Sequence, residues 1–203
     1  MITDATTIKL SKKLHLIDPI QRLGIVYHFE IEIDNALEKI HLSGVDHVEY
    51  DLHTTAVWFR LLRQQGIKFH LLVALMVLLL YIDVEIFKKF MDEKGKFKED
   101  LVNDVLGMLN LYEAAHLQFH GEDILEEAIA FTTSRLESMA TKLSPLLAEQ
   151  IAHALIHPIR KGLLRIEARH YISSYSGETH FTSSNVALLK FARWISTRYK
   201  HCI

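Results

Sequence analysis

The chain has 203 residues, 49% of them hydrophobic, and its charges nearly balance at a net of −2. This length can bury one substantial core, and the lack of a Lys/Arg-rich stripe argues against nucleic acid as the main partner, because that binding depends on phosphate neutralisation. The single cysteine, Cys202, excludes an internal disulfide framework and suits a reducing, cytoplasmic compartment.

Apolar residues recur at helical spacing through most of the chain. In residues 27–42, Phe29, Ile33, Leu37 and Ile40 follow one another at intervals of four, four and three, with acidic residues between them. The same pattern predicts further helices over residues 51–65, 98–117, 122–143, 145–156, 163–175 and 183–199. No segment alternates with a period of two, so strands are not expected. The pattern predicts an all-α domain of antiparallel helices joined by short loops.

Several residues indicate where these helices begin and end. Asp18 and Pro19 have the order expected of an N-cap followed by a proline in the first turn, and Ser144 with Pro145 repeats it. Three glycines are expected where helices end or turn: Gly66, Gly121 and Gly162.

One apolar run interrupts this pattern. Residues 71–82 read LLVALMVLLLYI, and charged residues bound the run at Lys68 and Asp83. A helix of this length spans about 18 Å, against about 30 Å for the hydrocarbon core of a bilayer. The run is therefore too short to cross a membrane.

The stretch GEDILEE is the most suggestive acidic group. Its carboxylates on Glu122, Asp123, Glu126 and Glu127 lie one helical turn apart in pairs and could hold Mg²⁺. The group directly follows Gly121, however, and acidic residues are favoured in the first turn of a helix by its unpaired N–H groups and its dipole. We therefore interpret the stretch as the start of a helix and reject it as a metal site.

Two other groups of polar residues invite a functional interpretation. His116 and His120 have the i, i+4 spacing of a helical zinc pair, but no third ligand accompanies them at a supporting spacing. In RIEARHYISSY, Arg165 and Arg169 lie one turn apart with Glu167 between them, and could face an anion or a neighbouring domain. The alternative for these three residues is a solvated basic edge paired with nearby acids.

Five stretches of the chain, taken in their order along the sequence, form a distinctive pattern. They are KLHLIDPIQRLGIVYHFEIEIDNAL, TTAVWFRLLRQQGIK, DVEIFKKFMDEKGKFKEDLVNDVLGMLNLYEAAHLQFHGEDILEEAIAFTT, HALIHPIRKGLLRIEARHYISSY and NVALLKFA, and they cover most of residues 13–192. In this order they resemble the N-terminal helical domain of plant terpene synthases, most closely the sesquiterpene cyclases of the cadinene synthase type. The resemblance implies antiparallel helices in a double-layered α/α barrel, truncated at both ends.

The resemblance also implies a domain organisation. It assigns residues 1–182 to the N-terminal domain, with an atypical apolar insertion at about 69–82, and residues 183–203 to a divergent, truncated start of the first helix of the catalytic domain. In the family, a DDxxD motif and an NSE/DTE motif in that following domain bind the Mg²⁺ that ionises a prenyl diphosphate. Neither motif occurs in this sequence.

The expected function follows from what the resemblance covers. The full-length parent would be a lyase of terpenoid biosynthesis that cyclises farnesyl diphosphate with Mg²⁺, whereas this chain is expected to hold no catalytic, cofactor or metal site and to be inactive alone. Its expected partner is the missing catalytic domain or a full-length synthase. The alternative is a non-catalytic helical protein that docks on a full-length synthase or associates with itself.

Overall fold

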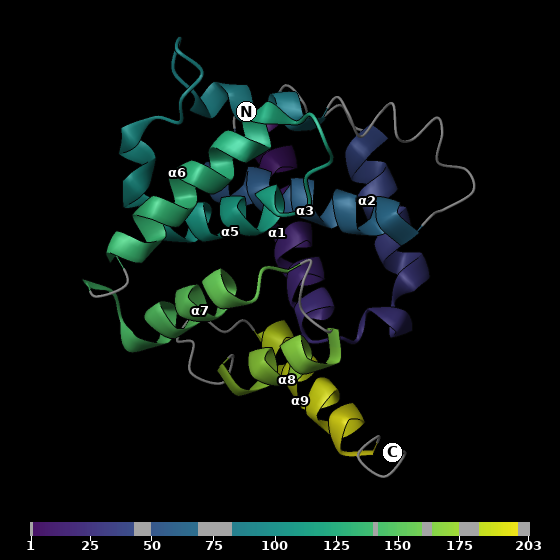
Figure 1. Ribbon diagram of the computed structural model, residues 1–203. Coiled ribbons are helices and arrows are strands. Elements are labelled where there is room, and N and C mark those ends of the chain that lie inside the picture. Colours follow the sequence, from purple (N-terminus) through teal and green to yellow (C-terminus); the bar gives the residue numbers. More distant parts are fainter. Residues whose placement is uncertain are drawn as a thin grey trace. The chain divides into compact units, whose positions relative to one another are not determined.

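The computed structural model describes residues 2–42, 50–68, 83–139, 142–159, 164–174 and 183–198. The elements in these ranges are helices, with one isolated bridge between Met91 and Phe97 (Figure 1). The predicted all-α class is confirmed. No helix among the described residues is long and apolar enough to cross a membrane, and the run at 71–82 lies outside these residues.

The chain divides into two compact units. The first comprises Met1–Lys39 and Gly162–Ile203, and the second comprises Ile40–Lys161. The boundary between residues 182 and 183, which the family resemblance suggests, stays a prediction.

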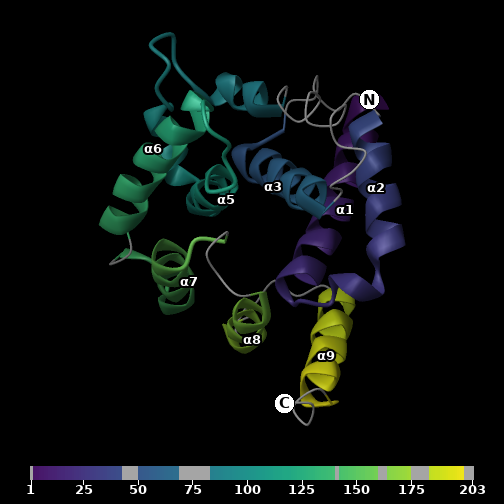
Figure 2. The same ribbon diagram turned by 45° about the vertical axis from the view of Figure 1, so that its right-hand side comes forward.

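The second unit is built around one almost completely buried helix. Its elements are α3 (Leu52–Lys68), η3 (Asp83–Phe90), η4 (Glu99–Asn103), α5 (Val105–Ala115), α6 (Asp123–Met139) and α7 (Pro145–Ile156). Figure 2 shows α5 between α3 and α6, and α5 packs against both of them and against α7. Every α5 residue from Gly107 to Ala115 is buried, because neighbours surround this apolar helix. Phe59 of α3 meets Phe87 of η3 edge to face, with ring centroids 5.2 Å apart.

The first unit joins the two ends of the described chain. Its elements are α1 (Ile2–Arg22), η1 (Val26–His28), most of α2 (Glu30–Leu42), α8 (Leu164–Ser174) and α9 (Ser183–Arg198). The helix α1 packs against α8 and α9. Gly24, at a φ of +68°, follows α1, and the N–H of Ile25 returns to the carbonyl of Ile20 at 3.2 Å. A Cβ on Gly24 would lie 2.9 Å from the Cβ of Ala168, so the glycine also permits a close approach to α8.

Most predicted helices are present, but three boundary predictions are wrong. Pro19 lies inside α1, where Asp18 contacts Arg22 one turn later instead of capping a helix start. The helix α3 continues through Gly66 to Lys68. The predicted helix 98–117 is divided, because the Asp104 carboxylate accepts the Gly107 N–H at 2.8 Å and caps a new helix at Val105.

The other boundaries agree more closely with the sequence. Ser144 is the N-cap of α7, with Pro145 in its first turn, as predicted. Gly121 precedes α6 at a φ of +90°. Gly162 lies outside the described residues.

Candidate functional site

The four carboxylates of GEDILEE take separate places in the structure. Glu122 is buried, whereas Asp123 and Glu126 are exposed in the first turn of α6. The Glu122 carboxylate accepts a hydrogen bond from the Arg63 guanidinium at 2.5 Å and another from the Phe119 N–H at 2.8 Å. The stretch therefore begins a helix at Asp123, and its innermost carboxylate holds α3 to the loop before α6.

Arg63 completes this contact from the other side. Its guanidinium lies over two rings, 4.8 Å from the centroid of Phe59 and 4.7 Å from that of Phe119. The side chains of Arg63 and Glu122 are 1% and 2% exposed, so the ion pair lies in the interior. Arginine suits this position, because a planar guanidinium can bind a carboxylate and stack on aromatic rings at the same time.

A second buried arginine lies one turn earlier on α3. Nε of Arg60 lies 3.8 Å from a carboxylate oxygen of Glu113 on α5, and Arg60 also donates to the Gln64 side chain at 3.2 Å. The two arginines tie α3 to α5 and to the start of α6. No motif predicts these contacts, but the sequence does contain one signal for them, which is the presence of two arginines three residues apart in the apolar stretch AVWFRLLR.

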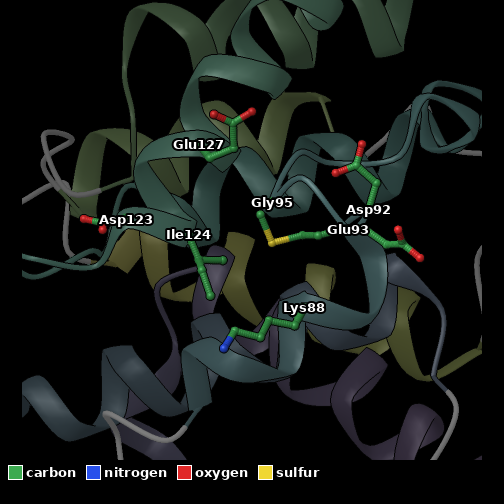
Figure 3. Close-up of a pocket in the computed structure, with 8 residues that line it drawn as sticks. Lys88, Asp92, Glu93, Gly95, Asp123, Ile124 and Glu127 are labelled. Atoms are coloured by element: carbon green, nitrogen blue, oxygen red, sulfur yellow. The ribbon is translucent and has the colours of Figure 1, made fainter.

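A surface pocket of about 400 Å³ lies in the same unit, between η3 and α6. Its lining residues are Lys88, Met91, Asp92, Glu93, Gly95, Asp123, Ile124 and Glu127. Figure 3 shows the carboxylates of Asp92, Asp123 and Glu127 pointing in different directions around it. The pocket has an acidic rim without a common point on which these oxygens converge.

Two of the acids on this rim, Asp92 and Glu127, have protein partners. Oδ1 of Asp92 accepts the backbone N–H groups of Lys94 at 2.8 Å and Lys96 at 2.9 Å. These bonds, chiefly the one from Lys96, hold the pKa of the Asp92 carboxyl below its ordinary value. Glu127 accepts from Nζ of Lys96 at 2.7 Å. Among the residues that the structure describes, no group of three or more His, Cys, Asp or Glu residues could hold a metal ion.

The histidine pair is separated by a helix end. His116 is the C-cap of α5, and its Nδ1 lies 3.0 Å from the carbonyl of Tyr112. His120 is exposed beyond the end of that helix. A zinc pair with i, i+4 spacing needs both histidines on one face of a helix. Because α5 ends at His116, the two residues do not share such a face.

The residues considered for an interdomain contact lie on α8. Arg165 and Arg169 are exposed, and Glu167 is half-buried. Ala168 is the buried residue of this segment and faces Gly24, while Ile166 is 57% exposed. The role of Arg165, Glu167 and Arg169 in an interdomain contact stays a prediction.

Three kinds of comparison with known proteins agree with one another. The family model described as "Terpene synthase, N-terminal domain" matches residues 1–155. Over 183 residues the chain is 50% identical to (−)-germacrene D synthase of Vitis vinifera, an alignment that covers 90% of this chain and 30% of the relative. It is 45% identical to (+)-delta-cadinene synthase of Gossypium arboreum, again with 90% and 30% covered.

Solved structures show the same relation. Isoprene synthase from grey poplar, in complex with three Mg²⁺ ions and dimethylallyl-S-thiolodiphosphate, has a TM-score of 0.75 and 37% identity, covering 88% of this chain and 32% of that one. A limonene synthase with 2-fluorolinalyl diphosphate has a TM-score of 0.74 and 29% identity, covering 95% and 38%. The chain spans about a third of the length of the curated relatives that it matches.

Proposed function

Because the chain belongs to the terpene synthase family, we propose that it acts as the N-terminal helical portion of an enzyme that cyclises farnesyl diphosphate. The observation that carries this proposal is the match of the N-terminal family model over residues 1–155. Relatives named germacrene D synthase, valencene synthase and delta-cadinene synthase support the sesquiterpene assignment. The resemblance to plant terpene synthases, including the cadinene type, is confirmed.

The chemistry of the proposed enzyme would reside outside this chain. We propose that the whole enzyme is a lyase that depends on Mg²⁺, which would offset the negative charge of the departing diphosphate. Glu122 is bound to Arg63, and the carboxylates around the pocket point in different directions. We therefore propose no catalytic role for these acids. Since the sequence also contains no DDxxD motif, we predict that the chain alone is inactive.

A chimera tests this proposal directly. This chain would replace the matching segment of (−)-germacrene D synthase from Vitis vinifera, and hydrocarbon products would be measured by gas chromatography with farnesyl diphosphate and Mg²⁺. We expect turnover by the chimera and none by the chain alone. The matched control is the same relative without that segment. Turnover by the isolated chain would contradict the inactivity, and a folded chimera no more active than the control would contradict the supporting role.

A second candidate function, as a binding partner, is favoured by the large apolar side chains that are exposed on the first unit. Ile31, Ile166 and Trp194 are 74%, 57% and 52% exposed, and exposed apolar surface often marks an interaction site. The chain would then be a non-catalytic partner that docks on a full-length synthase or on itself. Light scattering tests this candidate, since a strictly monomeric chain that does not bind a synthase would eliminate it.

A further inference from the structure

Two histidines at the C-terminal end of α7 form a close pair in the second unit. The imidazole centroids of His153 and His157 lie 5.2 Å apart, and the ring planes are inclined by 47°. His157 is the C-cap of α7, and its backbone N–H donates to the carbonyl of His153 at 2.8 Å. This bond closes the last helical turn and holds both side chains on one face of α7.

The same spacing occurs at His116 and His120 with a different result. There the first histidine of the pair is the C-cap, so the second lies beyond the helix. In α7 the second histidine is the C-cap, so one helical turn still connects the two residues. The i, i+4 arrangement of zinc-binding helices is thus realised in the structure at His153 and His157.

The separation of the two rings suits a tetrahedral zinc ion. A zinc ion bound at about 2.0–2.1 Å from a histidine nitrogen lies about 3.2 Å from the centroid of that ring. Two rings arranged at the tetrahedral angle around the ion then have centroids about 5 Å apart, which agrees with the observed 5.2 Å. A half-turn of either ring about its Cβ–Cγ bond exchanges the ring edges with little movement of the centroid, so each ring can present a nitrogen to the ion.

The surroundings of the pair favour a cation. His157 is exposed and His153 is half-buried, so a dissolved ion can reach the pair. The helix Pro145–Ile156 contains no lysine or arginine, and its one acidic residue, Glu149, lies one turn before His153 on the same face. Among the described residues no third His, Cys, Asp or Glu joins the pair in a group that could hold a metal, so the pair supplies two ligands.

We propose that His153 and His157 bind one Zn²⁺ ion, with water at its remaining coordination positions, and that this ion fastens the last turn of α7. Imidazole suits Zn²⁺, whereas Mg²⁺ prefers oxygen ligands, so this site differs from the Mg²⁺ site of the proposed enzyme. Structural zinc sites use four protein ligands and catalytic ones three, so binding by two is weaker and reversible. The inference does not depend on the proposed function, because it concerns only side chains of α7.

Modification of histidines by diethyl pyrocarbonate, measured for each residue by mass spectrometry, tests the site in the full chain. The reagent attacks an imidazole nitrogen, and a bound metal ion blocks that nitrogen. With Zn²⁺ at about a hundred times its dissociation constant the site is free about 1% of the time, so modification of His157 should slow by more than about tenfold. His120, which is also exposed, should change little, and Mg²⁺ at the same concentration should protect neither residue.

Two variants test whether both histidines bind the same ion. His153→Gln should remove the Zn²⁺ protection of His157, because loss of even an outer-shell partner costs about 10–100-fold in metal affinity and loss of one of two ligands costs at least as much. His153→Gln with Ala152→His keeps thirteen histidines but places the pair five residues apart on different helical faces, so it should lose the protection as well. His116→Gln is the matched control that should keep it. Ala152 is exposed, and circular dichroism would verify that each variant remains folded.

Hydrogen exchange of the His157 amide tests the effect on the helix end. An opening of the last turn that separates the two rings must first release the ion. At the same Zn²⁺ concentration such openings become about a hundredfold rarer, so exchange of this amide should slow toward that factor. The His116 N–H, which donates to the Tyr112 carbonyl at the C-cap of α5, is the matched control and should not change.

Each outcome bears on one part of the inference. Zn²⁺ protection of both rings that disappears in the two variants supports the site. Protection of His157 that persists when the pair is five residues apart, or equal protection of His120, overturns it. Protected rings with unchanged exchange of the His157 amide overturn the action of the ion on the helix end.

Discussion

Replacement of Glu122 by alanine would remove the carboxylate that pairs with the buried guanidinium of Arg63. The mutation removes the 2.5 Å contact with Arg63 and the acceptor of the Phe119 N–H, at a place where both charged side chains are at most 2% exposed. Removing one member of a buried ion pair costs about 3–5 kcal/mol, since the remaining charge stays buried. Folded domains of this size are stable by about 5–15 kcal/mol, so a large fraction of the stability would be lost.

Urea unfolding followed by tryptophan fluorescence measures this loss. In a Trp194→Phe background the signal comes from Trp58 alone, which is buried on α3 in the same unit as the ion pair. The matched control is Glu127→Ala, whose partner Lys96 has a side chain that is 64% exposed. Surface ion pairs contribute about 0–1 kcal/mol, so this control should lower the free energy of unfolding only slightly. Glu122→Ala should move the midpoint to much lower urea concentration.

A double-mutant cycle identifies the cause. Arg63→Met combined with Glu122→Ala should be less destabilised than the sum of the single variants, because neither charge of the pair then remains buried. The reasoning is refuted if Glu122→Ala and Glu127→Ala lower the free energy of unfolding by amounts that agree to within about 0.5 kcal/mol.

Two further stability predictions concern turns and caps. Gly24→Ala should destabilise the chain by more than the roughly 1–2 kcal/mol cost of a left-handed alanine, because its Cβ would also lie 2.9 Å from Ala168. Gly95→Ala, at a φ of +74° with open space around it, is the matched control, and equal thermal shifts for the two variants would contradict this. Asp104→Ala should cost about 1 kcal/mol in urea unfolding through loss of the Gly107 cap, and Asp104→Asn should restore most of it; equal losses for the two would count against the cap.

Helix positions were predictable where periodicity and end signals agreed. The helix α7 runs from Pro145 to Ile156 as predicted, with Ser144 at the N-cap position and a proline in the first turn of a regular apolar stripe. The predictions failed at three residues, Pro19, Gly66 and Asp104, where the local signal and the apolar periodicity disagreed. Gly66 lowers helix propensity without stopping α3, and Pro19 is tolerated inside α1. Asp104 divided a continuous apolar pattern because its carboxylate satisfies a backbone N–H of the following turn.

The buried ion pairs were beyond sequence reasoning for a different reason. Periodicity shows that Arg63 lies on an apolar helix. Its partner Glu122, however, is 59 residues away, and the sequence does not distinguish it from the other acidic residues of GEDILEE. Only the packing of α3 against the loop before α6 distinguishes Glu122 from the exposed Asp123 beside it. The family could be recognised from the sequence because several stretches in the same order carry far more information than any single polar residue.

The Arg63 and Glu122 pair also constrains the order in which the second unit can fold. Glu122 supplies the carbonyl that accepts the N–H groups of Leu125 and Glu126 in the first turn of α6, and its side chain reaches α3 across 59 residues. Burying a charge without its partner is costly. We therefore expect the start of α6 and the helix α3 to pack together in one step, in which both charges become buried as a pair. Contacts of such long sequence separation slow the search for the native topology. The two helices therefore belong to one cooperative unit, whose amides should open to exchange together.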